Sequence, residues 1–331
     1  MLDKESSTKI LQTPPATNNS ATFLFWHISK SGGTSAKAIY RCLLGSNSVS
    51  VLSSRAHVVK AKAMEEEQQQ ASMSFTGFSS SPSAFLSSFT SSSSSVERIT
   101  PNVIFSMIPD MVATNIFNPM NKGRLLVLFR HPVDRLVSKF YYLQTATWET
   151  GYKPHWQEKS LLSWAGRINR DNEHLVRALA GKHSGDTVTE LDLIRAKETT
   201  RQYIFVGLTD QMEESVRRFN TIMGIHDADA VVNEDGTRVC MDEFFGKEGE
   251  EAVDGDGSGG GRRRMKKLNS NPHPMVSHCL AVHKGDLEWD ILAERNMLDI
   301  QLYEYIVQLF YEQKDIINTY YVKSNLADTT P

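Results

Sequence analysis

The stretch from residue 22 to residue 45 constrains the fold more than any other part of the chain. Residues 22–26 (Thr-Phe-Leu-Phe-Trp) form a short, continuous run of β-forming side chains, which is typical of a buried strand. A glycine pair follows, and beyond it apolar side chains recur at helical spacing until Gly45 supplies a stop. Strand, loop and helix in this order are the first half of a βαβ unit, so the stretch predicts an α/β fold.

The same alternation of strand and helix patterns continues along the chain. Strand-like apolar runs occupy residues 47–52, 102–109, 124–129 and 203–207. Helical periodicity marks residues 133–141, residues 210–223 with Asp210 and Glu213 as the expected capping pair, and residues 287–310 with Asn296 as the expected interruption. Strands that alternate with helices predict a central parallel sheet covered on both faces, a three-layer sandwich of the P-loop type.

Composition divides the chain into one folded domain, two insertions and two tails. Residues 21–320 are expected to form a single domain, whereas residues 1–20 and 321–331 are expected to be loose tails. Segment 64–100 is rich in Glu, Gln and Ser, and segment 246–264 is acidic, then glycine-rich, then basic. Neither segment carries enough apolar surface to offset the entropy of ordering, so both are expected to be disordered insertions. The serine-rich insertion is alternatively a phosphorylated regulatory loop.

The bulk composition is that of an ordinary soluble globular protein. The 331 residues are 40% hydrophobic and 23% charged, and the net charge of −3 provides no basic field to attract nucleic acid. No apolar run reaches the roughly 18 residues that a membrane span needs, and the N-terminal 20 residues lack a signal-peptide core. We therefore expect a soluble chain, attached to a membrane only if an anchor lies upstream or has been removed.

The three cysteines and the histidine spacing give no metal signature. Cys42 lies on the expected first helix, where a buried small apolar residue is the simplest interpretation. Cys240 and Cys279 could pair, although two cysteines do not establish a compartment. No Cys/His spacing is typical of a zinc site, so we predict that no metal is bound.

The loop after the first strand carries the groups of an anion-binding site. Its glycines allow close approach and unusual dihedral angles, so successive N–H groups can point into one concavity. The N-terminus of the following helix adds about half a positive charge, and Lys30 adds a full one. The expected anion-binding residues are Lys30, Ser31, Gly32, Gly33, Thr34 and Ser35. The alternative is an ordinary strand-to-helix turn with a surface lysine.

A second motif begins where the strand at 124–129 ends. Arg130 stands at the expected carboxyl edge of the sheet, where α/β proteins bind ligands, and Ser138 follows just over two helical turns later. An arginine fork and a hydroxyl group on one rigid element could hold a second phosphate. Alternatively, Arg130 and Arg135 are ion-pair residues and Ser138 faces solvent.

Together, the two motifs resemble those of the sulfotransferase family that uses 3′-phosphoadenosine 5′-phosphosulfate (PAPS). Residues 25–35 are similar to its 5′-phosphosulfate loop, F-x-H-I-P-K-S/T-G-G-T-S, with Ser29 in place of the usual proline. Residues 130–140 are similar to its 3′-phosphate element, R-N/D-P-x-x-R-x-x-S-x-F/Y, with His131 in place of Asn or Asp. Three further segments resemble, more weakly, the branch of this family that sulfates glycans in the secretory pathway: residues 171–181, 205–220 and 296–310.

The resemblance implies an enzyme that transfers a sulfonyl group from PAPS, without a metal, to a hydroxyl of a carbohydrate or glycoconjugate. It implies that Lys30 stabilises the bridging oxygen as the sulfur–oxygen bond breaks. It also implies that Arg130 and Ser138 bind the 3′-phosphate. The family branch further implies the Golgi lumen and a membrane tether, although the sequence displays no tether.

The general base is the missing part of this assignment. An acceptor hydroxyl has to lose a proton, and related glycan sulfotransferases often carry a His or Glu at a strand end between the two motifs. Met107 occupies the corresponding position and cannot accept a proton, so it is expected in the core or in a pocket lining. The nearest candidate is His57, and Asp110 and Glu97 are less well positioned.

Two other functions remain open on the sequence alone. A P-loop kinase of small molecules is the second enzyme class, but the lysine comes early and the pattern G-x-x-x-x-G-K-S/T is absent from the sequence. A catalytically silent module that binds adenosine 3′,5′-bisphosphate or a glycan is the third possibility, and Met107 is its main support.

Overall fold

The computed structural model describes residues 22–52, 54, 56–59, 62, 102–116, 123–149, 152–166, 172–183, 185–225, 240–241, 244–245 and 282–327. Its strands are β1 (Thr22–Trp26), β2 (Val49–Val51), β3 (Asn102–Ser106), β4 (Gly123–Phe129) and β5 (Ile204–Leu208). Its helices are α2 (Gly33–Leu44), α4 (Pro109–Ile116), α5 (Pro132–Thr145), α6 (Leu161–Ala165), α7 (His174–Leu179), α8 (Glu190–Tyr203), α9 (Met212–Met223), α11 (Leu287–Glu294) and α12 (Met297–Ala327). The expected tail at 1–20 and both expected insertions lie outside the described residues.

The strands form one parallel sheet in the order β2-β3-β1-β4-β5, which confirms the predicted central parallel sheet. Leu24 at the centre of β1 pairs with Ile104 of β3 on one side and with Leu125 of β4 on the other. After β3 the chain crosses back over β1 to form β4, so the strand order reverses beside β1. In open parallel sheets, ligands bind at the carboxyl ends of the strands at such a reversal.

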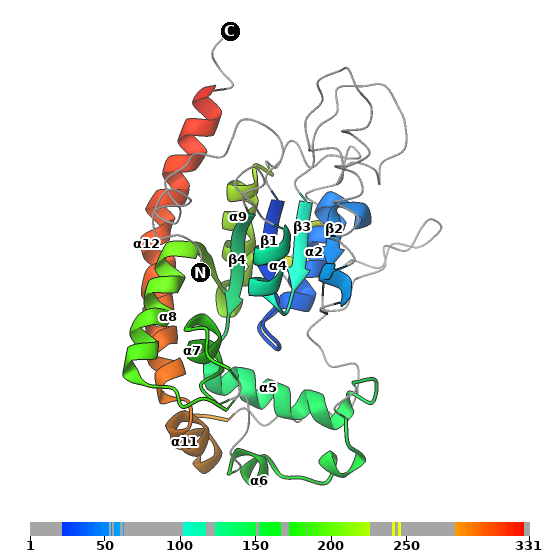
Figure 1. Ribbon diagram of the computed structural model, residues 1–331, viewed down its shortest axis with the longest axis vertical. Coiled ribbons are helices and arrows are strands. Elements are labelled where there is room, and N and C mark those ends of the chain that lie inside the picture. Colours follow the sequence, from blue (N-terminus) through cyan, green and yellow to red (C-terminus); the bar gives the residue numbers. More distant parts are fainter. Residues whose placement is uncertain are drawn as a thin grey trace, which may run out of the picture.

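Helices cover both faces of the sheet (Figure 1), as the sequence predicts. Phe23 and Phe25 of β1 belong to the buried cluster of α2 and α9 on one face. Leu24 packs with α4, and Trp26 with the cluster of α7, α8 and α12, on the other face. Because both faces are buried, β1 reads as a continuous apolar run instead of an alternating one. A separate cluster joins α5, α6 and α11 beyond the carboxyl ends of the strands.

Several element boundaries differ from the sequence prediction. The strand expected at 102–109 ends at Ser106, because Pro109 begins α4, and proline fits the start of a helix. The predicted capping pair of Asp210 and Glu213 is wrong. A 3₁₀ turn (Thr209–Gln211) precedes α9, no side chain caps that helix, and Asp210 instead accepts a hydrogen bond from the Tyr303 hydroxyl at 3.3 Å.

The interruption predicted at Asn296 is confirmed. Helix α11 ends at Glu294 and α12 begins at Met297, while the Asn296 amide donates to the Leu292 carbonyl at 2.7 Å and its oxygen accepts from the Glu173 backbone N–H. Helix α12 extends to Ala327, well beyond the expected helix end at 310 and into the segment expected as a tail.

The N-termini of α7 and α12 cap each other. The Glu173 carboxylate accepts from the backbone N–H groups of Leu298 and Asp299, and the Asp299 carboxylate accepts from those of Leu175 and Val176. Glu173 adopts a positive φ of 51°. Each carboxylate therefore supplies acceptors to N–H groups that a helix start leaves unsatisfied, and the two helices hold each other in position.

This capping arrangement predicts a pH dependence of stability. Burial raises the pKa of Glu173 from 4.5 to about 7. A carboxyl group whose pKa is higher in the folded chain contributes stability below pH 4.5, and this contribution is lost as pH rises through about 7. The Glu173→Gln variant cannot ionise, so its free energy of unfolding relative to wild type should rise between pH 5 and pH 8. We expect a rise on the order of 1–2 kcal/mol, since partial exposure screens the charge.

Urea unfolding at both pH values measures this difference. The exposed Glu158→Gln variant provides the matched control, because it removes a carboxyl group from a surface turn. The prediction is contradicted if the difference in free energy of unfolding between Glu173→Gln and wild type stays constant with pH.

Strand β5 forms one edge of the sheet, and a side chain of α12 covers part of that edge. The Gln313 amide oxygen accepts from the Val206 backbone N–H at 2.9 Å, and its NH₂ group donates to the Ile204 carbonyl at 2.8 Å. Gln313 is only 3% exposed. The amide thus bonds to the edge backbone as a neighbouring strand would.

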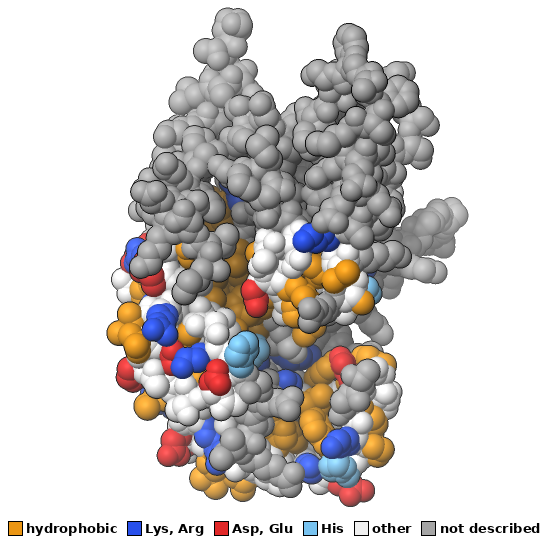
Figure 2. Space-filling model, viewed as in Figure 1, with side chains coloured by type: hydrophobic (Ala, Val, Ile, Leu, Met, Phe, Trp, Pro, Cys, Tyr) orange, Lys and Arg blue, Asp and Glu red, His pale blue; other side chains and the backbone are white. Residues whose placement is uncertain are grey.

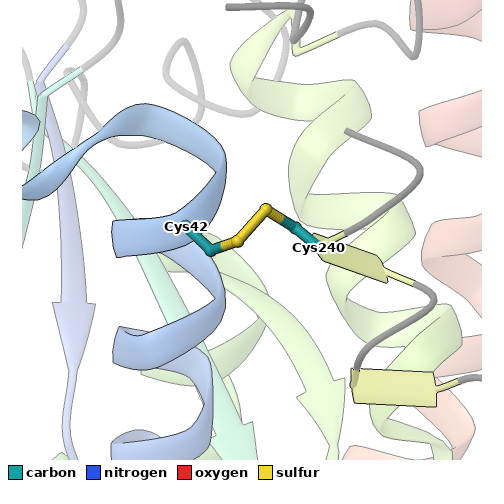
Figure 3. The surroundings of a disulfide bond; sticks show 2 residues. All are labelled: Cys42 and Cys240. Carbon is teal, nitrogen blue, oxygen red and sulfur yellow. A yellow bond between two sulfur atoms is a disulfide. The ribbon is translucent and has the colours of Figure 1, made fainter. Parts of the chain in front are cut away.

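A disulfide joins Cys42 near the end of α2 to Cys240 (Figure 3). The Cα atoms are 5.9 Å apart, and 198 residues separate the two cysteines in sequence. The prediction of Cys42 as a buried free thiol is therefore wrong. Its side chain is exposed and bonds to Cys240, which packs in the cluster of α2 and α9. The pairing considered between Cys240 and Cys279 is replaced by this bond, and Cys279 lies outside the described residues.

Loss of this disulfide should destabilise the fold. A cross-link between distant residues restricts the unfolded chain, and its removal typically costs about 2–4 kcal/mol. We expect this loss in the free energy of unfolding for Cys42→Ser and for the double Cys42→Ser/Cys240→Ser variant, measured with guanidinium chloride. The single and double variants should agree, because either one removes the same bond. A free Cys42 thiol in the unreduced wild type, detected by alkylation and mass spectrometry, contradicts the prediction.

Candidate functional site

The predicted anion-binding residues lie at the carboxyl edge of the sheet, where the strand order reverses. The loop after β1 and the start of α5 after β4 face this edge, and α5 runs across it (Figure 1). Figure 2 shows the surface hollowed between the sheet and α5, with Lys or Arg side chains visible inside the hollow. A ligand at this edge therefore meets groups from two neighbouring strands.

Two glycines give the loop after β1 its shape. Gly32 has a positive φ of 80° and precedes the first residue of α2, a conformation that side-chain-bearing residues rarely adopt. At Gly33, an added Cβ would lie 2.1 Å from the His27 ring, so only glycine allows this packing. Lys30 also has a positive φ, 67°. A non-glycine residue in this region marks backbone strain of a kind that occurs at ligand sites.

The loop presents donors, although not the full set that the sequence predicts. The Ser31 backbone N–H donates to the Ile28 carbonyl at 3.2 Å, so it does not belong to the expected row of free amides. The N–H groups of Gly33, Thr34 and Ser35 form the first turn of α2, where a helix offers no acceptor. The helix start is thus the main source of amide donors.

The hydroxyl groups of the loop differ in their surroundings. The Ser31 side chain is 1% exposed, and its hydroxyl has no hydrogen-bond partner in the described part of the chain. Ser35 is buried and Thr34 is exposed. The Thr209 hydroxyl, just after the end of β5, donates to the Ser31 carbonyl at 3.1 Å and so ties the loop to the end of β5. A buried hydroxyl without a partner fits a bound anion, which would accept its hydrogen.

The structure brings Arg130 to the loop. Arg130 follows β4, which pairs directly with β1, and its Nη1 donates to the Lys30 carbonyl at 3.3 Å. The two sequence motifs, 100 residues apart, therefore meet at one point of the sheet edge. Ser138 is half-buried, two turns into α5.

Arg135 has a different environment from Arg130. It is only 1% exposed, and its charge lowers the pKa of the buried Asp299 carboxyl, which burial raises more strongly. A buried arginine needs a nearby negative charge, and the Asp299 carboxyl is close enough for the Arg135 charge to lower its pKa. Asp299 in turn caps α7.

Aromatic side chains surround the residue next to Arg130. The His131 ring stacks on Trp289 of α11 with ring centroids 6.0 Å apart, and meets the edge of Tyr303 of α12 at 5.5 Å. Tyr303 donates to Asp210, and burial, followed by the Asp210 charge, raises its pKa. The sequence reasoning missed Trp289, Tyr303 and this use of Asp210, since only the fold brings these segments beside Arg130.

Lys30 contacts a second residue that the sequence reasoning missed. Its ammonium lies 4.2 Å from the ring centroid of Tyr142, near the end of α5, which is the geometry of a cation–π interaction. His27, on the other side of the loop, has a lowered pKa because of burial and the charges of Lys37 and Lys30. The positive charge of the loop thus comes from Lys30, while His27 stays neutral and packs against Gly33.

Two of the candidate bases from the sequence, His57 and Asp110, lie in the described residues, and neither takes part in the contacts given above. His57 is exposed beyond β2, which is separated from β1 by β3, and its backbone N–H donates to the Ser54 hydroxyl. Asp110 is exposed in the first turn of α4, and Glu97 lies outside the described residues. Met107 is 53% exposed, so it does not lie in the core, and its expected place in a pocket lining stays a prediction. The role of His57 stays a prediction.

A parallel sheet with an anion-binding loop after its central strand, and an arginine from the neighbouring strand beside that loop, defines an α/β protein of the phosphate-loop class. A family model described as "Sulfotransferase family" matches residues 16–305, and the chain belongs to this family. Its general chemistry is sulfonyl transfer. A comparison with curated proteins finds no match.

Two further properties concern only the described part of the chain. Its residues contain no group of three or more His, Cys, Asp or Glu side chains arranged to hold a metal ion. Within the same residues, no helix combines the length and apolar character that crossing a membrane requires.

Proposed function

We propose that the protein transfers the sulfonyl group of PAPS to a hydroxyl of a carbohydrate or glycoconjugate. Bound PAPS supplies the activated sulfonyl group. The first turn of α2 and the Ser31 hydroxyl bind its 5′-phosphosulfate, and Lys30 stabilises negative charge on the oxygen that leaves sulfur. Arg130 and Ser138 bind the 3′-phosphate. The glycan acceptor rests on the weaker motif similarity at 171–181, 205–220 and 296–310.

The observation that carries the proposal is the hydrogen bond from Arg130 to the Lys30 carbonyl. It joins two cationic residues from different motifs at one sheet edge, as a donor with phosphate groups at both ends of its ribose requires. A kinase has less support, because family membership favours sulfonyl transfer over phosphoryl transfer. The exposed Met107 keeps a silent binding module as the competing proposal.

The disulfide supports an oxidising compartment as part of this proposal. Disulfides persist in secreted proteins and in the secretory pathway, and they are rare in the cytosol. The Cys42–Cys240 bond therefore favours the Golgi lumen, where glycans are modified. Retention of this bond in protein recovered from secretory membranes, measured by alkylation before lysis, tests this part of the proposal.

Two steps test the proposed function. Retention of the purified protein on immobilised adenosine 3′,5′-bisphosphate in the presence of a magnesium chelator is expected for a PAPS enzyme. Transfer of radiolabelled sulfate from PAPS to a panel of polysaccharide and glycoprotein acceptors then identifies catalysis. Retention without transfer to any acceptor favours the silent module, and magnesium-dependent binding of ATP instead favours the kinase.

A further inference from the structure

A chain of contacts leads from Lys30 to a carboxylate. The Lys30 ammonium lies over the Tyr142 ring, 4.2 Å from its centroid. The Tyr142 hydroxyl donates to Oε1 of Glu149 at 2.5 Å and accepts from the indole N–H of Trp148 at 3.2 Å. The Trp148 and Tyr142 rings also meet edge to face, with centroids 6.1 Å apart. One aromatic side chain thus separates the ammonium from the carboxylate.

The direction of these hydrogen bonds makes Glu149 the acceptor. The indole N–H can only donate, so the Tyr142 oxygen accepts from it and the phenolic hydrogen points to the carboxylate. Burial, and next the hydrogen bond to Glu149, raise the pKa of Tyr142, which keeps its hydroxyl protonated at neutral pH. The Tyr142 hydroxyl engages Oε1 of Glu149.

The backbone also holds Glu149 in this position. Its N–H donates to the Ala146 carbonyl at 3.0 Å, and its own carbonyl accepts from the Tyr152 N–H at 2.9 Å. Glu149 therefore sits on a hydrogen-bonded turn that directly follows α5, the helix that begins beside Arg130. Its side chain is exposed, so an acceptor molecule can reach it.

We propose that Glu149 is the general base that removes the proton from the acceptor hydroxyl, and that Tyr142 is a positioning residue that orients its carboxylate. This assignment rests on the proposed sulfonyl transfer. Glu149 supplies the proton acceptor that Met107 cannot provide. It approaches Lys30, through Tyr142, from the turn after α5, whereas Met107 follows the end of β3.

The proposed step balances in atoms and charge. The acceptor oxygen forms a bond to sulfur while the bond between sulfur and the bridging phosphate oxygen breaks. The hydroxyl proton moves to the Glu149 carboxylate, and the electron pair of the broken bond stays on the phosphate oxygen beside Lys30. The products are the sulfate ester, adenosine 3′,5′-bisphosphate and a protonated Glu149, which returns its proton to solvent.

Glu149→Gln and Tyr142→Phe test the proposal. Glutamine keeps the shape and can accept the tyrosine hydrogen bond, but it cannot take a proton at neutral pH. We expect its single-turnover rate of sulfate transfer to fall about 10²–10⁴-fold, with unchanged affinity for adenosine 3′,5′-bisphosphate. Phenylalanine keeps the ring beside Lys30 and removes the hydroxyl. The transfer rate of Tyr142→Phe should fall less than that of Glu149→Gln. The pH–rate profile of Tyr142→Phe should keep its acidic limb, but the midpoint of that limb should shift.

The controls separate this proposal from the proposed function. Glu158→Gln removes another exposed carboxyl group and should transfer at the wild-type rate. Transfer by Glu149→Gln within threefold of wild type overturns the assignment of the base while sulfonyl transfer stands. A large loss in His57→Ala together with an active Glu149→Gln transfers the role to His57. Absence of transfer by wild type, in every acceptor tested, overturns both proposals.

Discussion

The Lys30→Ala variant is expected to lose sulfate transfer by about 10³-fold or more, while it keeps most of its affinity for adenosine 3′,5′-bisphosphate. The ammonium of Lys30 is the only charge on the loop, since His27 is held neutral by burial and neighbouring cations. Negative charge on the bridging oxygen develops fully only in the transition state, so loss of the ammonium should affect the rate far more than binding. The amide donors at the start of α2 remain.

Single-turnover transfer from labelled PAPS and calorimetric titration with adenosine 3′,5′-bisphosphate separate these two effects. Lys314→Ala, at an exposed position of α12, is the matched control for removal of one lysine charge. The Lys30→Arg variant should recover part of the rate, because it restores a charge with a different shape. The assigned role fails if affinity and rate fall by the same factor in Lys30→Ala.

The Arg130→Ala variant is expected to lose selectivity for nucleotides that carry a 3′-phosphate. A charge-assisted hydrogen-bond pair that is truncated on one side costs about 2–4 kcal/mol, which corresponds to roughly 30- to 1,000-fold in affinity. Affinity for adenosine 5′-phosphate should fall only slightly, through the lost contact between Arg130 and the Lys30 carbonyl. The ratio of the two affinities is therefore the informative quantity.

Titration of wild type and variant with both nucleotides measures that ratio. Arg217→Ala removes an exposed arginine of α9 that pairs with Glu213 and provides the matched control. If wild type and Arg130→Ala both bind the two nucleotides with equal affinity, Arg130 does not recognise the 3′-phosphate.

The sequence predicts the sheet better than it predicts the helices around it. Buried parallel strands require continuous apolar runs, so β1, β4 and β5 can be recognised from the sequence alone. Helix α8 has a largely polar sequence, and α7 is six residues long, so neither gives a clear periodic signal. The partner of Cys42 could not be predicted either, since sequence spacing does not determine which cysteines pair.

The same limit applies to the candidate site. Lys30 and Arg130 are recognisable because each lies in a compact motif next to a strand. Tyr142, Trp289 and Tyr303 belong to no such motif, and their positions depend on how α5, α11 and α12 pack beside the sheet edge. Glu149 is likewise identified only through its contact with Tyr142.

The amide of Gln313 affects the tendency of this protein to aggregate at high concentration. Unpaired N–H and C=O groups on an outer strand invite a second molecule to add its own strand, which is a common route to aggregation. Because Gln313 bonds to the Val206 N–H and the Ile204 carbonyl from within the same molecule, this part of the β5 edge is not available to a strand of a second molecule. A truncation of α12 before Gln313 would therefore expose unpaired backbone groups of β5 and promote aggregation, even if the carboxyl edge of the sheet were left intact.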